Sequence, residues 1–265
     1  MFKIDTGGTV TPFVDPGGGT SLGIAVIGTN LYFGNSSGQL YVVDLTAPPS
    51  ASLLTTLPTD VNDIAVAPAG FGAFAGQLIV AGHNRIDVVH PITGVITPLA
   101  TFGGGGVNTI TLDFTPGGAL LAASMDEDAV FDVSAAGVLT PFASVGSTPG
   151  GLEVHPLTGE VYIAIEGAGT LEKLNPSGTV LSTFASTFPI DGGFFPTPLS
   201  FSNDGASLYY STSPSEIFAI DGFTTAAIPE PSGFALIGLG SIGLICMRRR
   251  RRGQAERSEE RRGGK

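Results

Sequence analysis

Residues 61–102 read VNDIAVAPAGFGAFAGQLIVAGHNRIDVVHPITGVITPLATF, and they contain one complete unit of the repeat that decides the fold. Four runs rich in apolar and β-branched residues, at 64–67, 78–81, 86–90 and 95–100, are separated by stretches of Gly, Pro, Asn and Asp. The first set of residue types favours strands, and the second favours turns. This stretch therefore predicts four short strands joined by turns.

Similar units recur along the chain. A polar residue ends the third strand of each, and the aligned residues are Asp5, Asp44, His90, Asp132, Asn175 and Asp221, at spacings of about 39 to 46 residues. Full copies occupy about 21–57, 61–102, 107–145 and 149–188, with three further strands in 195–222. A period of this length, with several short strands per unit, is typical of propeller blades.

We therefore predict that residues 1–225 form an all-β domain, a β-propeller of about five to six four-stranded blades. The N-terminal sequence reads as the middle of a β-hairpin, and we expect the piece at 2–14 to close the ring by adding its strand to the last copy, which gives five blades. Sequence upstream of Met1 would raise the number to six or seven. A solenoid or a β-sandwich is the alternative, and no stretch before Pro229 shows a sustained helical period.

Three stretches resemble a known group of propellers: GIAVI at 23–27, DIAVAP at 63–68 and GLEVHPLTGEVYIA at 151–164. They are similar to NHL-repeat, streptogramin-lyase-like and gluconolactonase-like propellers. In the gluconolactonase-like members a metal is held at the channel mouth by carboxylate and amide oxygens. Because propellers share physics without sharing function, the resemblance implies the fold and leaves the activity open.

Residues 226–252 read AAIPEPSGFALIGLGSIGLICMRRRRR and have a different character. The two prolines of the Pro229-Glu230-Pro231 tripeptide favour an exposed, extended spacer. The uncharged run at 232–247 is long enough for a short transmembrane helix, because 15 to 16 helical residues span roughly 22–24 Å of a core of about 30 Å. The arginines, Arg248, Arg249, Arg250, Arg251 and Arg252, then form a cytoplasmic stop that leaves the body outside.

This three-part order resembles the PEP-CTERM sorting signal of bacterial surface and secreted proteins, a tail that has also been labelled an ice-binding protein C-terminal domain. The resemblance implies an exosortase as partner, membrane insertion before cleavage near the tripeptide, and a host that makes exopolysaccharide. An ordinary C-terminal anchor is the alternative. The start, MFKIDTGGTVTPF, contains no signal peptide, so we expect an incomplete N-terminus. Residues 253–265 are expected to be a disordered tail, and 257–265 resemble a translated sequencing adapter.

Charge divides sharply between the body and the tail. Of the twelve Lys and Arg residues, only Lys3, Arg85 and Lys173 precede Arg248, whereas nineteen of the acidic residues precede Pro229. Such an acidic body repels phosphate backbones, so we expect no nucleic-acid partner. Cys246, the single cysteine, lies in the apolar run and excludes an intramolecular disulfide.

The first strands carry the most informative side chains. Each places a small or polar residue between two apolar ones, and alternation directs those residues into the central channel: Ala25, Ala65, Thr111, Glu153 and Ser200. In this alignment Glu153 is the only ionisable group of the layer. Asn62, Asp63 and Asn108 precede two of the strands, so we predict a divalent cation such as calcium bound by Glu153 with Asn62, Asp63 or Asn108. A hydrated structural channel is the alternative.

Other motifs favour structural readings. Ser36 lies in a G-x-S-x-G match that is followed by a strand rather than by the helix of a nucleophile elbow. The acidic run at 126–128 reads as a solvated turn, with calcium binding as the alternative. His83, His90 and His155 lack metal-ligand spacing and read as structural.

We conclude from the sequence that the chain is an exported surface or extracellular-matrix propeller that acts in binding or structure, and we assign no catalytic residue. Its expected partners are an exosortase, the membrane, and exopolysaccharide or matrix proteins. The alternative function is a metal-dependent hydrolase or lyase with its site at the channel mouth.

Overall fold

A computed structural model describes residues 1–4, 9–14, 21–103, 110–166, 168–185, 198–212 and 216–223. These residues belong to one compact unit, Met1–Thr224. The tripeptide Pro229-Glu230-Pro231, the arginine cluster and Asn108 lie outside the described residues.

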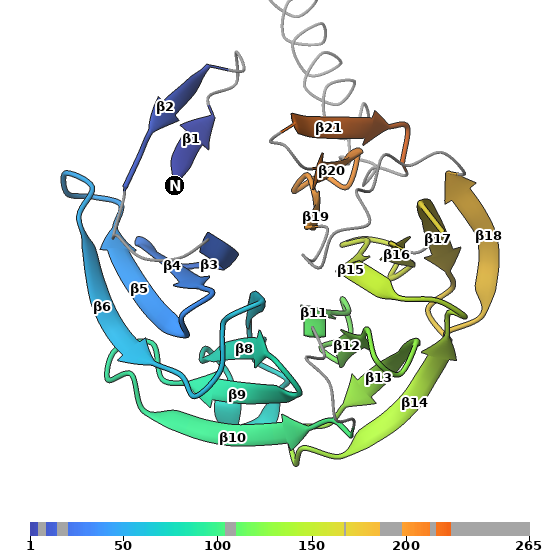
Figure 1. Cartoon of the computed structure of the whole chain (residues 1–265), viewed down its shortest axis with the longest axis horizontal. Helices are drawn as coiled ribbons and strands as arrows, with labels where there is room; N and C mark the ends of the chain where they lie inside the picture. Colours follow the sequence, from blue (N-terminus) through green and yellow to red (C-terminus); the bar gives the residue numbers. More distant parts are fainter. Residues whose placement is uncertain are drawn as a thin grey trace, which may run out of the picture. The chain divides into compact units, whose positions relative to one another are not determined.

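Five antiparallel sheets, which we number blades 1 to 5, succeed one another along the chain (Figure 1). Blade 1 contains β3 (Ser21–Ile27), β4 (Asn30–Asn35), β5 (Gln39–Asp44) and β6 (Ala51–Thr56), and blade 2 contains β7 (Asp63–Val66), β8 (Leu78–Gly82), β9 (Arg85–Val89) and β10 (Ile96–Thr101). Blade 3 contains β11 (Ile110–Phe114), β12 (Leu120–Ser124), β13 (Ala129–Val133) and β14 (Leu139–Ser144). Blade 4 contains β15 (Pro149–Val154), β16 (Val161–Ile165), β17 (Thr170–Leu174) and β18 (Val180–Ala185), and blade 5 contains β19 (Leu199–Phe201), β20 (Ser207–Thr212) and β21 (Glu216–Asp221).

The predicted propeller is confirmed as an all-β fold of five blades, and the solenoid and sandwich alternatives are wrong. Within each blade the strands follow chain order from the inner first strand to the outer last one. In blade 2 the observed strands begin and end within about one residue of the predicted runs. The single helical element of the described residues is the 3-10 turn η1 (Gly72–Phe74), and none of their helices is long and apolar enough to cross a membrane.

Four apolar clusters join successive blades face to face. Between blades 2 and 3, for example, Phe71 meets Phe114 edge to face, with ring centroids 5.1 Å apart, and Phe102 meets Phe131 at 5.6 Å. Each Val, Leu, Ile or Phe side chain buried in such a cluster contributes about 1.5–3 kcal/mol. The core of this protein is therefore a series of inter-blade layers around the ring.

The N-terminal hairpin differs from its prediction. β1 (Phe2–Ile4) and β2 (Val10–Pro12) pair with each other, and β20 is the only strand among those described that pairs with β21. Met1, Phe13 and Val14 pack against blade 1, where Phe33 and Tyr41 stack. The expected addition of a strand to the last copy is wrong, because β1 pairs with β2 instead and the residues beside this hairpin pack on the apolar face of blade 1.

The turn between the third and fourth strands contains a glycine in blades 2, 3 and 4. Gly137 has φ +77°, and a Cβ there would overlap the carbonyl oxygen of Leu99 on the preceding blade. Gly94 and Gly178 stand in the same relation to the blades before them. Only glycine fits this position, because it needs a left-handed backbone and direct backbone contact.

A side chain just after the third strand caps the same turn. Ser134 Oγ accepts the Val138 backbone N–H at 3.1 Å, and Asn175 Oδ1 accepts that of Thr179 at 2.9 Å. The repeat position in blade 3 is therefore Ser134, two residues beyond the predicted Asp132.

Candidate functional site in the central channel

The register of the strands shows which side chains of the inner strands lie at the same height along the central channel, and we call such a set one level. Glu153 on β15 lies opposite Tyr162, and Asp113 on β11 lies opposite Leu121, which occupies the same position on its second strand. The corresponding residues of all five blades are Ala25, Ala65, Asp113, Glu153 and Ser200. The prediction that Thr111 occupies this level, and that Glu153 is its only ionisable group, is wrong. Thr111 lies two residues earlier, at the level of Asp63.

Three carboxylates reach across from one inner strand to the next. Asp63 Oδ2 accepts the backbone N–H of Leu112 at 3.0 Å, and Asp113 Oδ2 accepts that of Val154 at 2.8 Å. Glu153 Oε1 accepts the backbone N–H of Phe201 at 3.0 Å. We call these three hydrogen bonds the inter-blade staples, because each joins one of blades 2, 3 and 4 to its successor.

Asp63 and Asp113 also use their second oxygen. Asp63 Oδ1 accepts the N–H of Ile64 at 2.8 Å, and Asp113 Oδ1 accepts that of Phe114 at 2.7 Å. A carboxyl group that accepts a donor on each oxygen is arranged as its ionised form, since a proton on either oxygen would face an N–H. The hydrogen bonds therefore oppose protonation.

Burial and mutual repulsion act in the other direction. Burial raises the pKa of Asp63 to about 6, and burial together with the nearby Asp63 charge raises the pKa of Asp113 to about 7, in each case against the hydrogen bonds that lower it. Burial, followed by the Asp113 charge, raises the pKa of Glu153 well above its ordinary value. The channel thus holds three carboxyl groups whose pKa values lie above the usual range and which titrate as a coupled set.

Arg85 and Lys173, the basic side chains that the structure describes, are held by acidic partners. Arg85 pairs with Asp87, and Lys173 Nζ lies 2.8 Å from Glu160 Oε1. Neither pair includes a channel carboxylate. Among the described residues, no Lys or Arg side chain therefore neutralises the carboxylates of the staples.

The predicted cation ligands are only partly brought together. Asp63 and Glu153 are close enough to influence each other electrostatically. Asn62 is 5% exposed, its backbone N–H donates to Ala81, and its Nδ2 has no partner among the described residues. Within those residues no three His, Cys, Asp or Glu side chains converge as a metal cluster, and Asn108 lies outside them. The cation site stays a prediction.

Two of the three histidine side chains, His90 and His155, stabilise turns. His90 Nδ1 accepts the backbone N–H groups of Ile92 and Thr93 at 3.2 and 3.3 Å, and His155 Nδ1 accepts the corresponding pair of its own turn. His83 Nε2 lies 2.9 Å from Asp60 Oδ2. These contacts agree with the structural readings.

Two further motifs lie in loops. Ser36 occupies the turn between β4 and β5, as expected for a hairpin. The acidic run at 126–128 lies between β12 and β13, where Glu127 accepts a hydrogen bond from the hydroxyl of Ser124.

The fold and the channel define a five-bladed propeller with an acidic inner wall, and comparisons with known proteins agree on the fold. The solved structure of a putative gluconolactonase matches with TM-score 0.61 and 16% identity, over 83% of this chain and 80% of that chain. Virginiamycin B lyase from Staphylococcus aureus matches with TM-score 0.54 and 13% identity, over 76% and 69%. A streptogramin B lyase matches with TM-score 0.53 and 12% identity, over 76% and 68%. No curated protein matches the chain.

The tail has a match of its own. Residues 227–251 fit the model of the PEP-CTERM protein-sorting motif. The predicted sorting signal is confirmed, and it implies an exosortase-sorted protein that is anchored in the membrane and then exported. The chain thus combines this motif with a propeller that resembles the streptogramin lyase and gluconolactonase folds.

Proposed function

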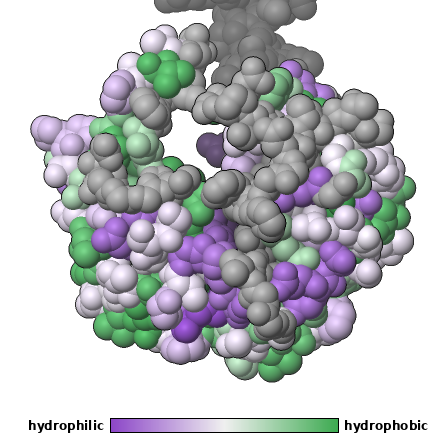
Figure 2. All heavy atoms as spheres, viewed as in Figure 1, coloured by the Kyte–Doolittle hydropathy of each residue, from purple (hydrophilic) through white to green (hydrophobic). Residues whose placement is uncertain are grey.

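We propose that this chain is a bacterial propeller that an exosortase releases near Pro229-Glu230-Pro231 and that then acts by binding at the cell surface or in the extracellular matrix. The match of residues 227–251 to the sorting motif carries the proposal. The acidic body supports it, because a high net charge of one sign favours solubility after release. Figure 2 shows hydrophilic residues toward the middle of the lower part of this face, where blades 2 and 3 lie, and hydrophobic residues at its rim.

A binding role fits the channel better than catalysis does. The three channel carboxylates are engaged in the inter-blade staples, so each has a structural task. The second candidate is the metal-dependent hydrolase or lyase. The raised pKa values of Asp113 and Glu153 favour it, because perturbed carboxyl groups cluster at functional sites.

Replacing Pro229, Glu230 and Pro231 by alanine tests the sorting step. In a bacterium with an active exosortase we expect the unchanged chain to yield a shortened product outside the membrane fraction. The triple variant should accumulate at full length in the membrane, and Gln254→Ala, just outside the matched residues, should be processed normally. Immunoblots of fractionated cells measure the outcome. Normal processing of the triple variant would refute the proposal.

A further inference from the structure

The grooves between successive blades are built from equivalent residues. In each of blades 1 to 4, one side chain of the second strand and its partner on the third strand face the next blade. These pairs are Tyr32 with Val42, Ile79 with Val88, Leu121 with Asp132, and Tyr162 with Lys173. Differences between grooves can therefore be read as substitutions at matching positions.

The groove between blades 4 and 5 is filled by the protein's own side chains. Tyr162 is 1% exposed, and its hydroxyl donates to Glu160 at 3.4 Å. Lys173 Nζ lies 2.8 Å from Glu160 Oε1 and 5.8 Å from the centre of the Tyr162 ring. Its hydrogen bond to Glu160 raises the pKa of Lys173, so the ammonium stays charged. This groove contains a lysine side chain that is bound by a carboxylate and an aromatic face.

The groove between blades 1 and 2 also holds a tyrosine. Tyr32, at the position of Tyr162, is 2% exposed and donates its hydroxyl to the carbonyl oxygen of Pro91 on blade 2 at 3.2 Å. A tyrosine from the second strand thus fills the groove in both cases.

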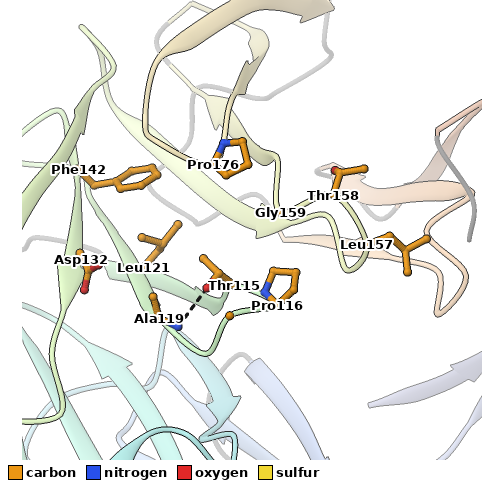
Figure 3. A pocket seen from close by; sticks show the side chains of 11 residues that line it. Thr115, Pro116, Ala119, Leu121, Asp132, Phe142, Leu157, Thr158, Gly159 and Pro176 are labelled. Atoms are coloured by element: carbon orange, nitrogen blue, oxygen red, sulfur yellow. Dashed lines mark hydrogen bonds between the residues drawn. The ribbon is translucent and has the colours of Figure 1, made fainter.

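The groove between blades 3 and 4 lacks these large side chains. Leu121, Asp132 and Ala119 stand where blade 4 has Tyr162, Lys173 and Glu160. The resulting cavity has a volume of about 350 Å³ and lies between the turns of the two blades. In Figure 3, Phe142 and Pro176 line one side, Thr115 and Pro116 line the other, and Asp132 lies beside Leu121.

The walls of this cavity are preorganised. Thr115 Oγ1 accepts the backbone N–H of Ala119 at 3.0 Å and fixes the turn that carries Pro116. Asn175 fixes the turn that carries Pro176, because its Oδ1 accepts the Ser177 N–H at 3.0 Å. Because the walls are already ordered, the protein loses little conformational entropy when a group binds.

Asp132 supplies the one charge among the residues that line the cavity. It is half-buried, and it has no hydrogen bond or ion pair with any part of the chain that the structure describes. A carboxylate at the edge of an apolar cavity is complementary to a group with an aliphatic stem and a cationic end.

We propose that this cavity binds a lysine or arginine side chain of a partner polypeptide, with its charged end on Asp132 and its stem against Leu121 and Phe142. In the groove between blades 4 and 5 the equivalent space already holds a lysine, Lys173, whose ammonium group lies against the Glu160 carboxylate. The acidic body adds long-range attraction for a basic partner. This inference rests on the proposed binding role and names its partner chemistry. It is independent of the sorting step, so the processing assay and the binding assay can fail separately.

The full-length chain in a neutral detergent is titrated with the peptide acetyl-Gly-Ala-Lys-Ala-Gly-amide, and binding is measured by calorimetry. The same peptide with norleucine in place of lysine is the uncharged control ligand. We expect the lysine peptide to bind, and Asp132→Asn and Leu121→Tyr each to weaken binding at least about tenfold, a loss of about 1.4 kcal/mol. Asp44→Asn, which removes an exposed carboxylate on blade 1, should change the affinity less than about twofold.

Leu121→Tyr is the decisive variant, because it fills the cavity without altering the charge. If it binds the lysine peptide as tightly as the unchanged chain, the attraction is non-specific and the proposal is wrong. Equal binding of the norleucine peptide, or no binding of the lysine peptide, would also overturn it. Leu121 is 1% exposed, so a melting measurement accompanies each variant. Ala119→Gln, which extends into the cavity from the position of Glu160, gives a second test where the tyrosine variant unfolds.

Discussion

Blade 1 is joined to blade 2 by a different kind of contact from the one that joins blades 2 to 5 to one another. Blade 1 has Ala25 in the channel layer, and blade 2 fits against it through glycines: a Cβ on Gly34 would overlap the Val61 side chain, and one on Gly23 would lie 2.9 Å from the Asp63 backbone. Blades 2 to 5 are joined by the inter-blade staples. The first contact depends on shape and the others on charge, so pH should affect them differently.

Filling the glycine contact should have the largest effect. Gly34→Val places branched carbons where the Val61 side chain already lies, and we expect it to lower the free energy of unfolding by about 3 kcal/mol. Gly70→Ala, at an open position, should stay within about 0.5 kcal/mol of the unchanged protein. Urea titration measures both. A Gly34→Val protein of normal stability would show that blades 1 and 2 are not held by close contact.

The folded state should become less stable as pH rises, because the buried channel carboxyl groups must then ionise. The folded-state pKa values of Asp63 and Asp113, about 6 and about 7, exceed the ordinary value of 3.8, so the folded chain binds more protons than the unfolded chain between these limits. This contribution to stability is complete below about pH 4 and is lost as pH rises to about 7. We therefore expect the free energy of unfolding to fall continuously between pH 4 and pH 7, as measured by urea titration at successive pH values.

Asp113→Asn removes one titrating group and should flatten that pH dependence. The matched control is Asp204→Asn, an exposed carboxyl whose pKa is lowered by the hydrogen bonds from Ala206 and Ser202. It should leave the loss between pH 4 and 7 unchanged. Equal slopes in the Asp113 variant and the unchanged protein would show that the channel carboxyls do not control stability.

The smallest effect concerns the predicted cation. A divalent ion near Glu153 would neutralise the channel charges and stabilise the folded state by mass action, by about 1.4 kcal/mol at ten times its dissociation constant. We expect calcium to raise the melting temperature of the unchanged protein at pH 8, and Glu153→Gln to abolish the rise while Asp204→Asn retains it. The absence of a rise with calcium, magnesium or manganese would refute the cation site.

The sequence was sufficient for the blades but not for the register of one inner strand. The strands of blade 2 were predictable because turn residues bound each apolar run. In blade 3 the run 110–114 is ITLDF, and period-two alternation fits it equally well after a shift of two residues. That ambiguity placed Thr111 where Asp113 lies. The turn Thr115-Pro116, which matches His155-Pro156 of blade 4, was the signal that would have fixed the register.

The staples and the cavity required coordinates. Asp113 and Glu153 occupy corresponding positions, but Asp63 lies two residues earlier in its strand. No sequence repeat therefore shows that all three accept an N–H from the following blade. The cavity exists because Leu121 is smaller than Tyr162, which occupies the equivalent position of blade 4. Its interpretation depends on that comparison. Both features depend on which surfaces of neighbouring blades are in contact, and the alternation of apolar and polar residues alone does not specify this.

The glycine turns that abut the preceding blade have a consequence for the curvature of the ring. Because Gly137 brings its backbone against the Leu99 carbonyl, the spacing of blades 2 and 3 at the outer rim is as small as two backbones allow. Successive blades are farther apart at the outer rim than at the channel, and the angle between them grows with this difference. The number of blades is a full turn divided by that angle. Glycine at 94, 137 and 178 keeps this angle small. A bulkier residue at all three positions would widen it and favour a ring of fewer blades.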